Sequence, residues 1–439
     1  MLDSIGIKDT AVIWEIGIVT SLIYVLFLLT LHNNTQKTYY TLFVLFFFVY
    51  SGIGVGYIKG VAPEYKTYYY IFLSTFSTAF RSFLLLTPSV GKFIAKSTSG
   101  FFNGFINDKR LVYVVFAVYF FAALIPLMFP KFELYKLLSP PAPDIAAEFK
   151  SRFTGEYDQP IRKIAANVTY VLYPFYLMGL YNYRRKLLTL IILLALPLYL
   201  NYCLVSYAGR SEIISVLIIF FSILWFYNQH LRRYLILTAL VFIPILFAFT
   251  LYYSAARAGE KAKTATSVNE KASNLVIFIE TSFPTFSRKV FSKENNFNIK
   301  QYYTWLVTLP IPKVLIGKVE AASPGAEISE VLLGKKAGTR GYFILLTGLV
   351  TESVYMYGKT FFFIHAIVIA LIISLLSRLT EGNPALFSLM IVYALLMSYN
   401  LNRAGLVAPI AIVINQFFSF YLIILFLMVR RLIGPTKGG

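Results

Sequence analysis

The feature that most constrains this chain is the recurrence of apolar runs that approach or exceed 18 residues. A helix of about that length crosses the roughly 30 Å hydrocarbon core of a bilayer. Backbone polar groups in hydrocarbon must pair within their own segment, so such runs predict helices, and the alternating pattern of membrane barrel strands is absent from the sequence. With 58% hydrophobic residues, the chain is predicted to be an all-α polytopic membrane protein.

Eleven runs are predicted to span the membrane, with twelve as the alternative. The predicted spans are 11–31, 39–58, 67–87, 111–129, 167–181, 187–207, 212–227, 234–253, 359–377, 384–400 and 407–429. The positive-inside rule places the short basic loops in the cytoplasm, among them 88–110 and 182–186, which puts the amino terminus outside. Residues 341–358 are either a surface or re-entrant helix, which the charge rule favours, or a twelfth span.

These spans divide the chain into three predicted parts. Residues 1–253 form an amino-terminal block of about eight spans, and residues 359–439 form a carboxyl-terminal block of about three. Between them, residues 254–358 form one large periplasmic loop that contains short helices. Its polar part, residues 254–340, holds thirteen Lys or Arg and seven Glu. A basic loop at the membrane surface indicates an anionic ligand.

Several other classes of protein are not favoured. The net charge of +20 lies mostly in short loops between spans, which the positive-inside rule explains without nucleic acid. The single cysteine, Cys203, excludes an intrachain disulfide framework. No His, Cys or Asp cluster has metal-ligand spacing, and no nucleotide-binding glycine motif is present. We therefore expect neither a metal nor a cofactor.

Four arginines lie at the predicted outer ends of spans, namely Arg210, Arg257, Arg340 and Arg403. Guanidinium groups offer forked donors that match phosphate oxygens, so together they predict a diphosphate site. The alternative is that each arginine caps a helix or pairs locally, as Arg210 would with Glu212.

Glu352 is the only carboxylate in an otherwise apolar stretch just after the loop. Burial would raise its pKa and make it a general base, whereas a salt bridge to one of the arginines would lower that pKa instead. Glu280 is a weaker second candidate for chemistry. His365 is a further candidate inside the following span, although a lone histidine there is more often a hydrogen-bonded core residue.

Several short motifs, in their order along residues 200–410, resemble the Wzy-type polymerases of bacterial O-antigen and related repeat-unit glycans, which belong to the C-type integral-membrane glycosyltransferases. The motifs are AGRSEII (208–214), SAARAG (254–259), YYTWLVTLPIPKVLIGK (302–318), TGLVTESVYMYGK (347–359) and NRAGL (402–406). The third motif ends in Lys318, which the resemblance adds as a secondary site candidate. Related ligases often have a histidine where this chain has Thr347, which favours Glu352 as the base.

The resemblance implies a multi-pass enzyme of the bacterial inner membrane, active at its periplasmic face in polysaccharide and lipopolysaccharide biosynthesis. Such an enzyme transfers a growing glycan from undecaprenyl diphosphate to the non-reducing end of another lipid-linked repeat unit. Its partners would be undecaprenyl-diphosphate-linked oligosaccharides, the bilayer and a chain-length regulator protein. The arginines would stabilise the leaving diphosphate without a metal.

Two alternatives remain open. A lipid-linked oligosaccharide flippase would bind the same diphosphate, but flippases usually have short outer loops and place charges within the spans. An O-antigen ligase would share the fold class but is disfavoured by Thr347.

Overall fold

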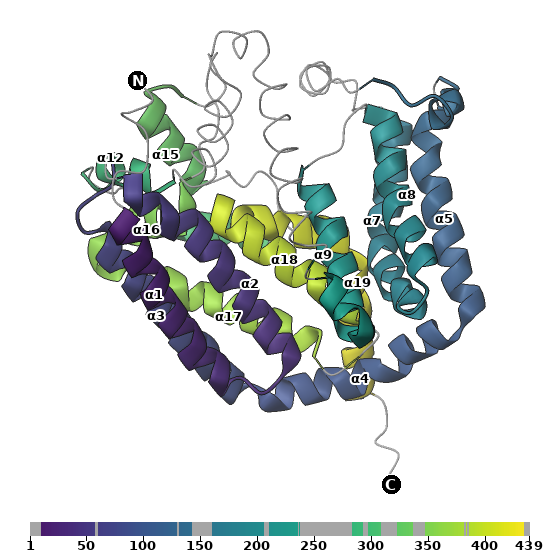
Figure 1. The fold of residues 1–439 in the computed structure, drawn as a ribbon, viewed down its shortest axis with the longest axis horizontal. Helices are drawn as coiled ribbons and strands as arrows, with labels where there is room; N and C mark the ends of the chain where they lie inside the picture. The colour runs from purple at the N-terminus through teal and green to yellow at the C-terminus, as the bar shows by residue number, and fades with distance from the viewer. Residues whose placement is uncertain are drawn as a thin grey trace. The chain divides into compact units, whose positions relative to one another are not determined.

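The computed structural model describes residues 10–57, 60–129, 131–142, 160–205, 210–235, 237, 283–292, 297–308, 323–336, 347–381, 383 and 386–433. Every regular element in these residues is helical (Figure 1). The α-helices are α1 (Thr10–Thr30), α2 (Asn34–Phe47), α3 (Tyr65–Leu86), α4 (Pro88–Asn107), α5 (Lys109–Met128), α7 (Pro160–Gly179), α8 (Leu187–Val205), α9 (Arg210–Tyr227), α12 (Ser287–Phe291), α13 (Ile299–Thr308), α15 (Pro324–Leu333), α16 (Gly348–Phe361), α17 (Phe363–Leu379), α18 (Phe387–Ala404) and α19 (Val407–Ile433).

Six helical segments of the described residues are long and apolar enough to cross a membrane, and α17 is a shorter apolar helix. These six segments are Thr10–Thr30, Asn34–Gly56, Tyr65–Leu86, Lys109–Met128, Leu187–Leu204 and Gln416–Ile433. The second continues α2 through the helical turns η1 (Phe48–Gly52) and η2 (Ile53–Tyr57). The prediction of a helical membrane protein is therefore supported, whereas the count of eleven or twelve spans stays a prediction.

One expected loop is a helix. The sequence predicts a basic loop over residues 88–110, but residues 88–107 form α4. Its buried positions include Ile94, Thr98, Phe102 and Phe105, which repeat at the helical spacing, while the cations project from the other side. The lysines between these apolar residues make the segment resemble a basic loop, so its helical period is not recognised from the sequence.

The described chain forms two compact units. The first comprises Met1–Lys92, Asn274–Glu381 and Tyr393–Ile414, and the second comprises Phe93–Ser273, Gly382–Val392 and Asn415–Gly439. Each unit combines segments from different parts of the sequence. The predicted boundaries at 253/254 and 358/359 stay predictions; the first lies outside the described residues.

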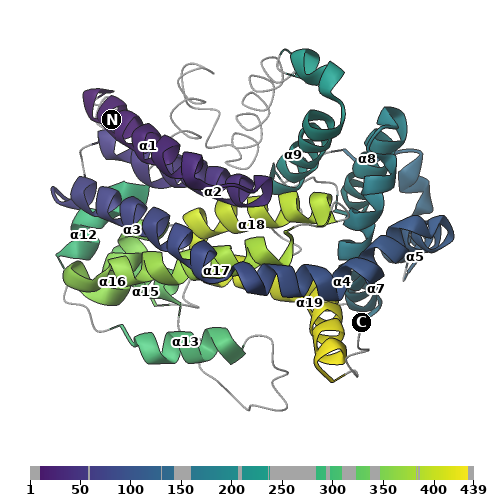
Figure 2. The ribbon, with the colours of Figure 1, turned by 90° about the horizontal axis from the view of Figure 1, so that it is seen from below.

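In the first unit, α1, α2, α3 and α17 pack side by side (Figures 1 and 2). α17 packs mainly along α3, and its buried Ala366, Ala370 and Ser374 repeat every four residues. Small residues at that spacing allow two helix backbones to approach closely. α3 packs on α2 through aromatic rings: Phe43 of α2 stacks on Phe76 with ring centroids 3.7 Å apart. These helices therefore pack along α17, whose start adjoins α16.

A short segment of the predicted loop is fixed against the start of α3. The Ala62 N–H donates to the Ser287 hydroxyl at 2.9 Å, and the Arg288 N–H donates to the Gly60 carbonyl at 2.9 Å. Gly60 has φ +86°, and a Cβ there would collide with the Thr285 carbonyl. The turn η8 (Phe283–Phe286) thereby lies beside α16.

In the second unit, α5 packs along α7, and α8 packs against both α5 and α9. Tyr119 of α5 and Tyr176 of α7 stack with ring centroids 4.5 Å apart. Gly179 allows close approach of the same two helices, because a Cβ there would lie 2.8 Å from the Phe116 ring. Two further short turns are η3 (Leu134–Leu137) and η5 (Leu180–Tyr183), and η6 (Gln229–Leu231) follows α9.

Candidate functional site

Glu352 is buried in the second turn of α16, with 4% of its surface exposed. Its neighbours on the helix, from Leu349 to Val354, are buried as well. Among the described residues no basic side chain forms an ion pair with it, so the alternative of a salt bridge finds no partner in this part of the chain. Burial raises the pKa of the Glu352 carboxyl from its ordinary 4.5 to about 8.

Gly405 lies against this carboxylate. The residue follows the end of α18 with φ +69°, and its N–H donates to the Leu401 carbonyl at 3.0 Å, which closes the helix with a left-handed glycine cap. A Cβ at position 405 would overlap both carboxylate oxygens of Glu352. The motif NRAGL and the motif TGLVTES, far apart in sequence, therefore meet at this point.

Tyrosine side chains from α13 lie near the same carboxylate. Tyr302 is fully buried, and its hydroxyl has no hydrogen-bond partner among the described residues. Burial raises the pKa of the Tyr302 hydroxyl first, and the charge of Glu352 raises it further. Tyr303 is also within electrostatic range of Glu352, and its hydroxyl shares a hydrogen bond with that of Tyr357 on α16. Two tyrosines of α13 thus lie within electrostatic range of the carboxyl.

Ser353 joins α16 to the start of α17. Its hydroxyl donates to the Leu349 carbonyl and lies 2.8 Å from Nδ1 of His365. Because a hydroxyl has one proton, Ser353 must accept from His365, which assigns the proton of the neutral ring to Nδ1. The buried Nε2 then carries a lone pair and has no partner in the described part of the chain. His365 is therefore a buried, hydrogen-bonded residue at the start of α17.

Arg403 lies in the last turn of α18, two residues before Gly405. Its Nη1 donates to the Tyr399 hydroxyl at 3.0 Å, and its guanidinium lies 5.5 Å from the centre of the same ring. Tyr399 is in turn packed edge-on against Tyr50. These contacts place a half-buried cation in the turn that also contacts Glu352.

The described residues do not test the remaining candidates. Arg210 is the first residue of α9 in the second unit, and its side chain is not among those described. Arg257, Arg340, Glu280 and Lys318 lie outside the described residues. The diphosphate site built from four arginines thus stays a prediction. Among the described residues, no group of three or more His, Cys, Asp or Glu could hold a metal ion.

Sequence reasoning missed four members of this cluster, namely Tyr302, Ser353, Tyr357 and Gly405. A signal for Tyr302 existed, since it begins one of the aromatic motifs in the large loop. Gly405 follows Arg403 in a turn between two apolar runs, where a left-handed cap is common. Its contact with Glu352 had no local signal.

The described fold is that of a helical membrane protein with a buried carboxyl group at the meeting point of two helix ends. Comparison with known proteins adds no family to this description: no family model, no curated protein and no solved structure matches the chain.

Proposed function

We propose that this chain is a glycosyltransferase of the bacterial inner membrane that polymerises lipid-linked repeat units at the periplasmic face. It would transfer a growing glycan from undecaprenyl diphosphate to the non-reducing end of a second undecaprenyl-diphosphate-linked unit. The observation that carries the proposal is the contact between buried Glu352 and Gly405, because it joins a carboxyl of raised pKa to the turn that bears Arg403.

The proposed topology has eleven spans, with the amino terminus in the periplasm. It places the Glu352 end of α16 and the end of α18 at the periplasmic face. Residues 254–340 would form the loop that covers the substrates and limits access of water, so that transfer is favoured over hydrolysis. A chain-length regulator would contact the enzyme from the membrane.

In the proposed reaction, an acceptor hydroxyl attacks the anomeric carbon of the donor sugar. The new carbon–oxygen bond forms as the bond to the diphosphate breaks, and the diphosphate leaves with the electron pair. The hydroxyl proton passes to the Glu352 carboxylate. A pKa of about 8 lies near neutral pH, where a general base is most effective.

Arg403 would neutralise the negative charge that develops on the departing diphosphate. Preorganised guanidinium groups can provide this stabilisation without a metal ion. Arg210, Arg257 and Arg340 are the further residues proposed for the same anion.

Reconstitution tests the proposal against its main rival. The purified full-length chain, placed in vesicles with an undecaprenyl-diphosphate repeat unit and chelator, should yield a ladder of longer lipid-linked glycans. Movement of the repeat unit across the bilayer without any ladder would instead identify a flippase. Transfer to a lipid A acceptor, with no lengthening, would identify a ligase.

A further inference from the structure

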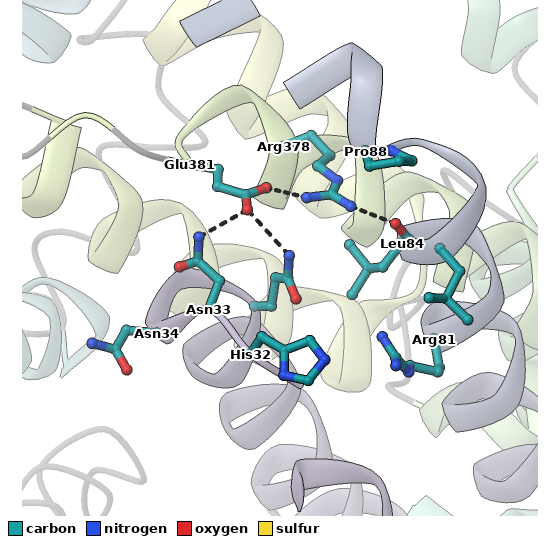
Figure 3. Close-up of a pocket in the computed structure, with 10 residues that line it drawn as sticks. His32, Asn33, Asn34, Arg81, Leu84, Pro88, Arg378 and Glu381 are labelled. Carbon is teal, nitrogen blue, oxygen red and sulfur yellow. Dashed lines mark hydrogen bonds and ion pairs between the residues drawn. The ribbon is translucent and has the colours of Figure 1, made fainter. Parts of the chain in front are cut away.

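A polar cavity of about 650 Å³ lies within the first unit, remote from Glu352. Its lining includes His32, Asn33 and Gln36 around the start of α2, Arg81 near the end of α3, and Arg378 and Glu381 at the end of α17 (Figure 3). His365, which contacts the residue next to Glu352, lies thirteen residues before Arg378 on α17. At 1.5 Å per residue, the two positions are about 20 Å apart along the helix. The cavity therefore lies at the other end of these helices.

One wall of the cavity is a neutralised ion pair. Arg378 is buried and pairs with Glu381, and its second Nη donates to the Leu84 carbonyl. The other oxygen of Glu381 accepts from the Asn33 amide at 2.8 Å and from the Gln36 amide at 3.2 Å. These contacts, all drawn in Figure 3, engage both oxygens of the Glu381 carboxylate. The pair therefore contributes rigidity but no net charge.

Arg81 gives the cavity its net positive charge. The side chain is half-buried and forms no hydrogen bond or ion pair with another described residue. A guanidinium held in a partly enclosed, low-dielectric site attracts anions more strongly than an exposed one. His32 and Asn34 line the same cavity and can donate hydrogen bonds to an oxyanion. The lining thus provides a cation and neutral hydrogen-bond donors, and the one carboxylate among its described residues, Glu381, is already paired.

Apolar side chains border this polar site. Leu85 lines the cavity and is 60% exposed, and the adjacent Leu86 is 75% exposed. α1 and α3, two of the helices long enough to span a bilayer, end within a few residues of the cavity lining. A cation and hydrogen-bond donors beside exposed leucines at the end of membrane helices match an amphiphile with an anionic head.

We propose that this cavity binds a phosphate anion, and that the phosphate is the headgroup of an anionic phospholipid. Arg81 contacts the phosphate oxygens through its forked donors, His32 and Asn34 donate to the same group, and the acyl chains lie along Leu85 and Leu86. This inference does not depend on the proposed polymerase activity, because none of these residues belongs to the cluster around Glu352.

Binding by the purified full-length chain in neutral detergent tests the proposal. Three probes are titrated and measured by calorimetry: dihexanoyl phosphatidylglycerol, dihexanoyl phosphatidylcholine and inorganic phosphate. The variants are Arg81→Gln, the charge-preserving Arg81→Lys, and Lys37→Gln as a matched control. Lys37 follows Gln36 on α2 but is not part of the cavity lining.

The wild-type chain should bind the anionic lipid at least about tenfold more tightly than the zwitterionic lipid, as expected for charge-assisted hydrogen bonds. Arg81→Gln should abolish that preference, Arg81→Lys should retain part of it, and Lys37→Gln should retain all of it. Tight binding of inorganic phosphate that displaces the lipid would assign the site to a free phosphate. Equal binding of the two lipids by the wild-type chain, or an unchanged preference in a folded Arg81→Gln variant, would overturn the proposal.

Discussion

Gly405 lies directly against the carboxylate of Glu352, so closely that a Cβ at position 405 would overlap both carboxylate oxygens. Two separate physical reasons therefore require glycine at position 405. Its backbone adopts φ +69°, which L side chains rarely do, and its missing side chain leaves room for a buried acid. This contact fixes the end of α18 relative to α16.

Gly405→Ala should therefore destabilise the protein far more than a left-handed glycine alone requires. Gly334 is the matched control, because it also caps a helix at φ +65° but has nothing within 4 Å of its would-be Cβ. We expect Gly334→Ala to cost about 1–2 kcal/mol for the backbone conformation. Gly405→Ala should cost clearly more, since overpacking adds about 1–3 kcal/mol.

A double-mutant cycle separates the two contributions. Glu352→Ala removes the carboxylate that the new methyl would meet, so Gly405→Ala should cost in that background only about what Gly334→Ala costs. Thermal unfolding in detergent measures the stability of the wild type, the two single variants and the double variant. Equal penalties for Gly405→Ala with and without Glu352 would contradict the contact.

The stability of the wild-type chain should fall as pH rises from 4.5 to 8. Burial raises the folded-state pKa of Glu352 to about 8 from 4.5, so the folded state holds its proton more tightly than the unfolded state does. The stabilisation is complete below pH 4.5 and is lost through pH 8, at about 1.4 kcal/mol per pH unit for this group. As pH rises over this range, the unfolding temperature of the wild type should therefore fall further than that of Glu352→Gln. Parallel curves over this range would show that the carboxyl is not buried as described.

The two tyrosines of α13 should respond differently to removal of the hydroxyl. Tyr302→Phe removes a buried hydroxyl that has no partner among the described residues, so stability should change by less than about 0.5 kcal/mol or increase. Tyr303→Phe leaves the Tyr357 hydroxyl without its hydrogen bond and should cost about 1 kcal/mol. Chemical unfolding of the two variants compares these values. A larger loss for Tyr302→Phe than for Tyr303→Phe would reveal a partner for the Tyr302 hydroxyl.

Arg403→Ala should lower glycan transfer by about 10²–10³-fold, the usual effect of removing one group that stabilises charge in a transition state. Arg403→Lys should recover only part of this loss, because an ammonium lacks the forked donors. Lys66→Ala is the control, since it removes an exposed cation of the same unit that pairs with Glu15. Initial rates at saturating substrate decide the outcome, and an Arg403→Ala variant as fast as Lys66→Ala would exclude Arg403 from the reaction.

Apolar length was sufficient to predict α1, α3 and α5, because the bilayer requires long runs and the runs are uninterrupted. It failed at α4, where lysines between apolar residues suggested a loop although the apolar positions follow a helical period. The residues of the candidate site also fall into a group that the sequence could predict and a group that it could not. Glu352 and Arg403 are unusual in their own segments and could be found locally, whereas Gly405 and Tyr302 matter only through contacts between distant parts of the chain.

The role of Glu352 as general base is tested most directly by comparing the wild-type chain with Glu352→Gln in vesicles that contain an undecaprenyl-diphosphate repeat unit and chelator. The amide has nearly the same shape as the protonated acid, so the variant should fold and bind substrate but accept no proton. We expect a ladder of elongated glycans from the wild type, with a rate that rises towards pH 8, and no ladder from Glu352→Gln at any pH. A full ladder from Glu352→Gln would contradict the role of this carboxyl as the base.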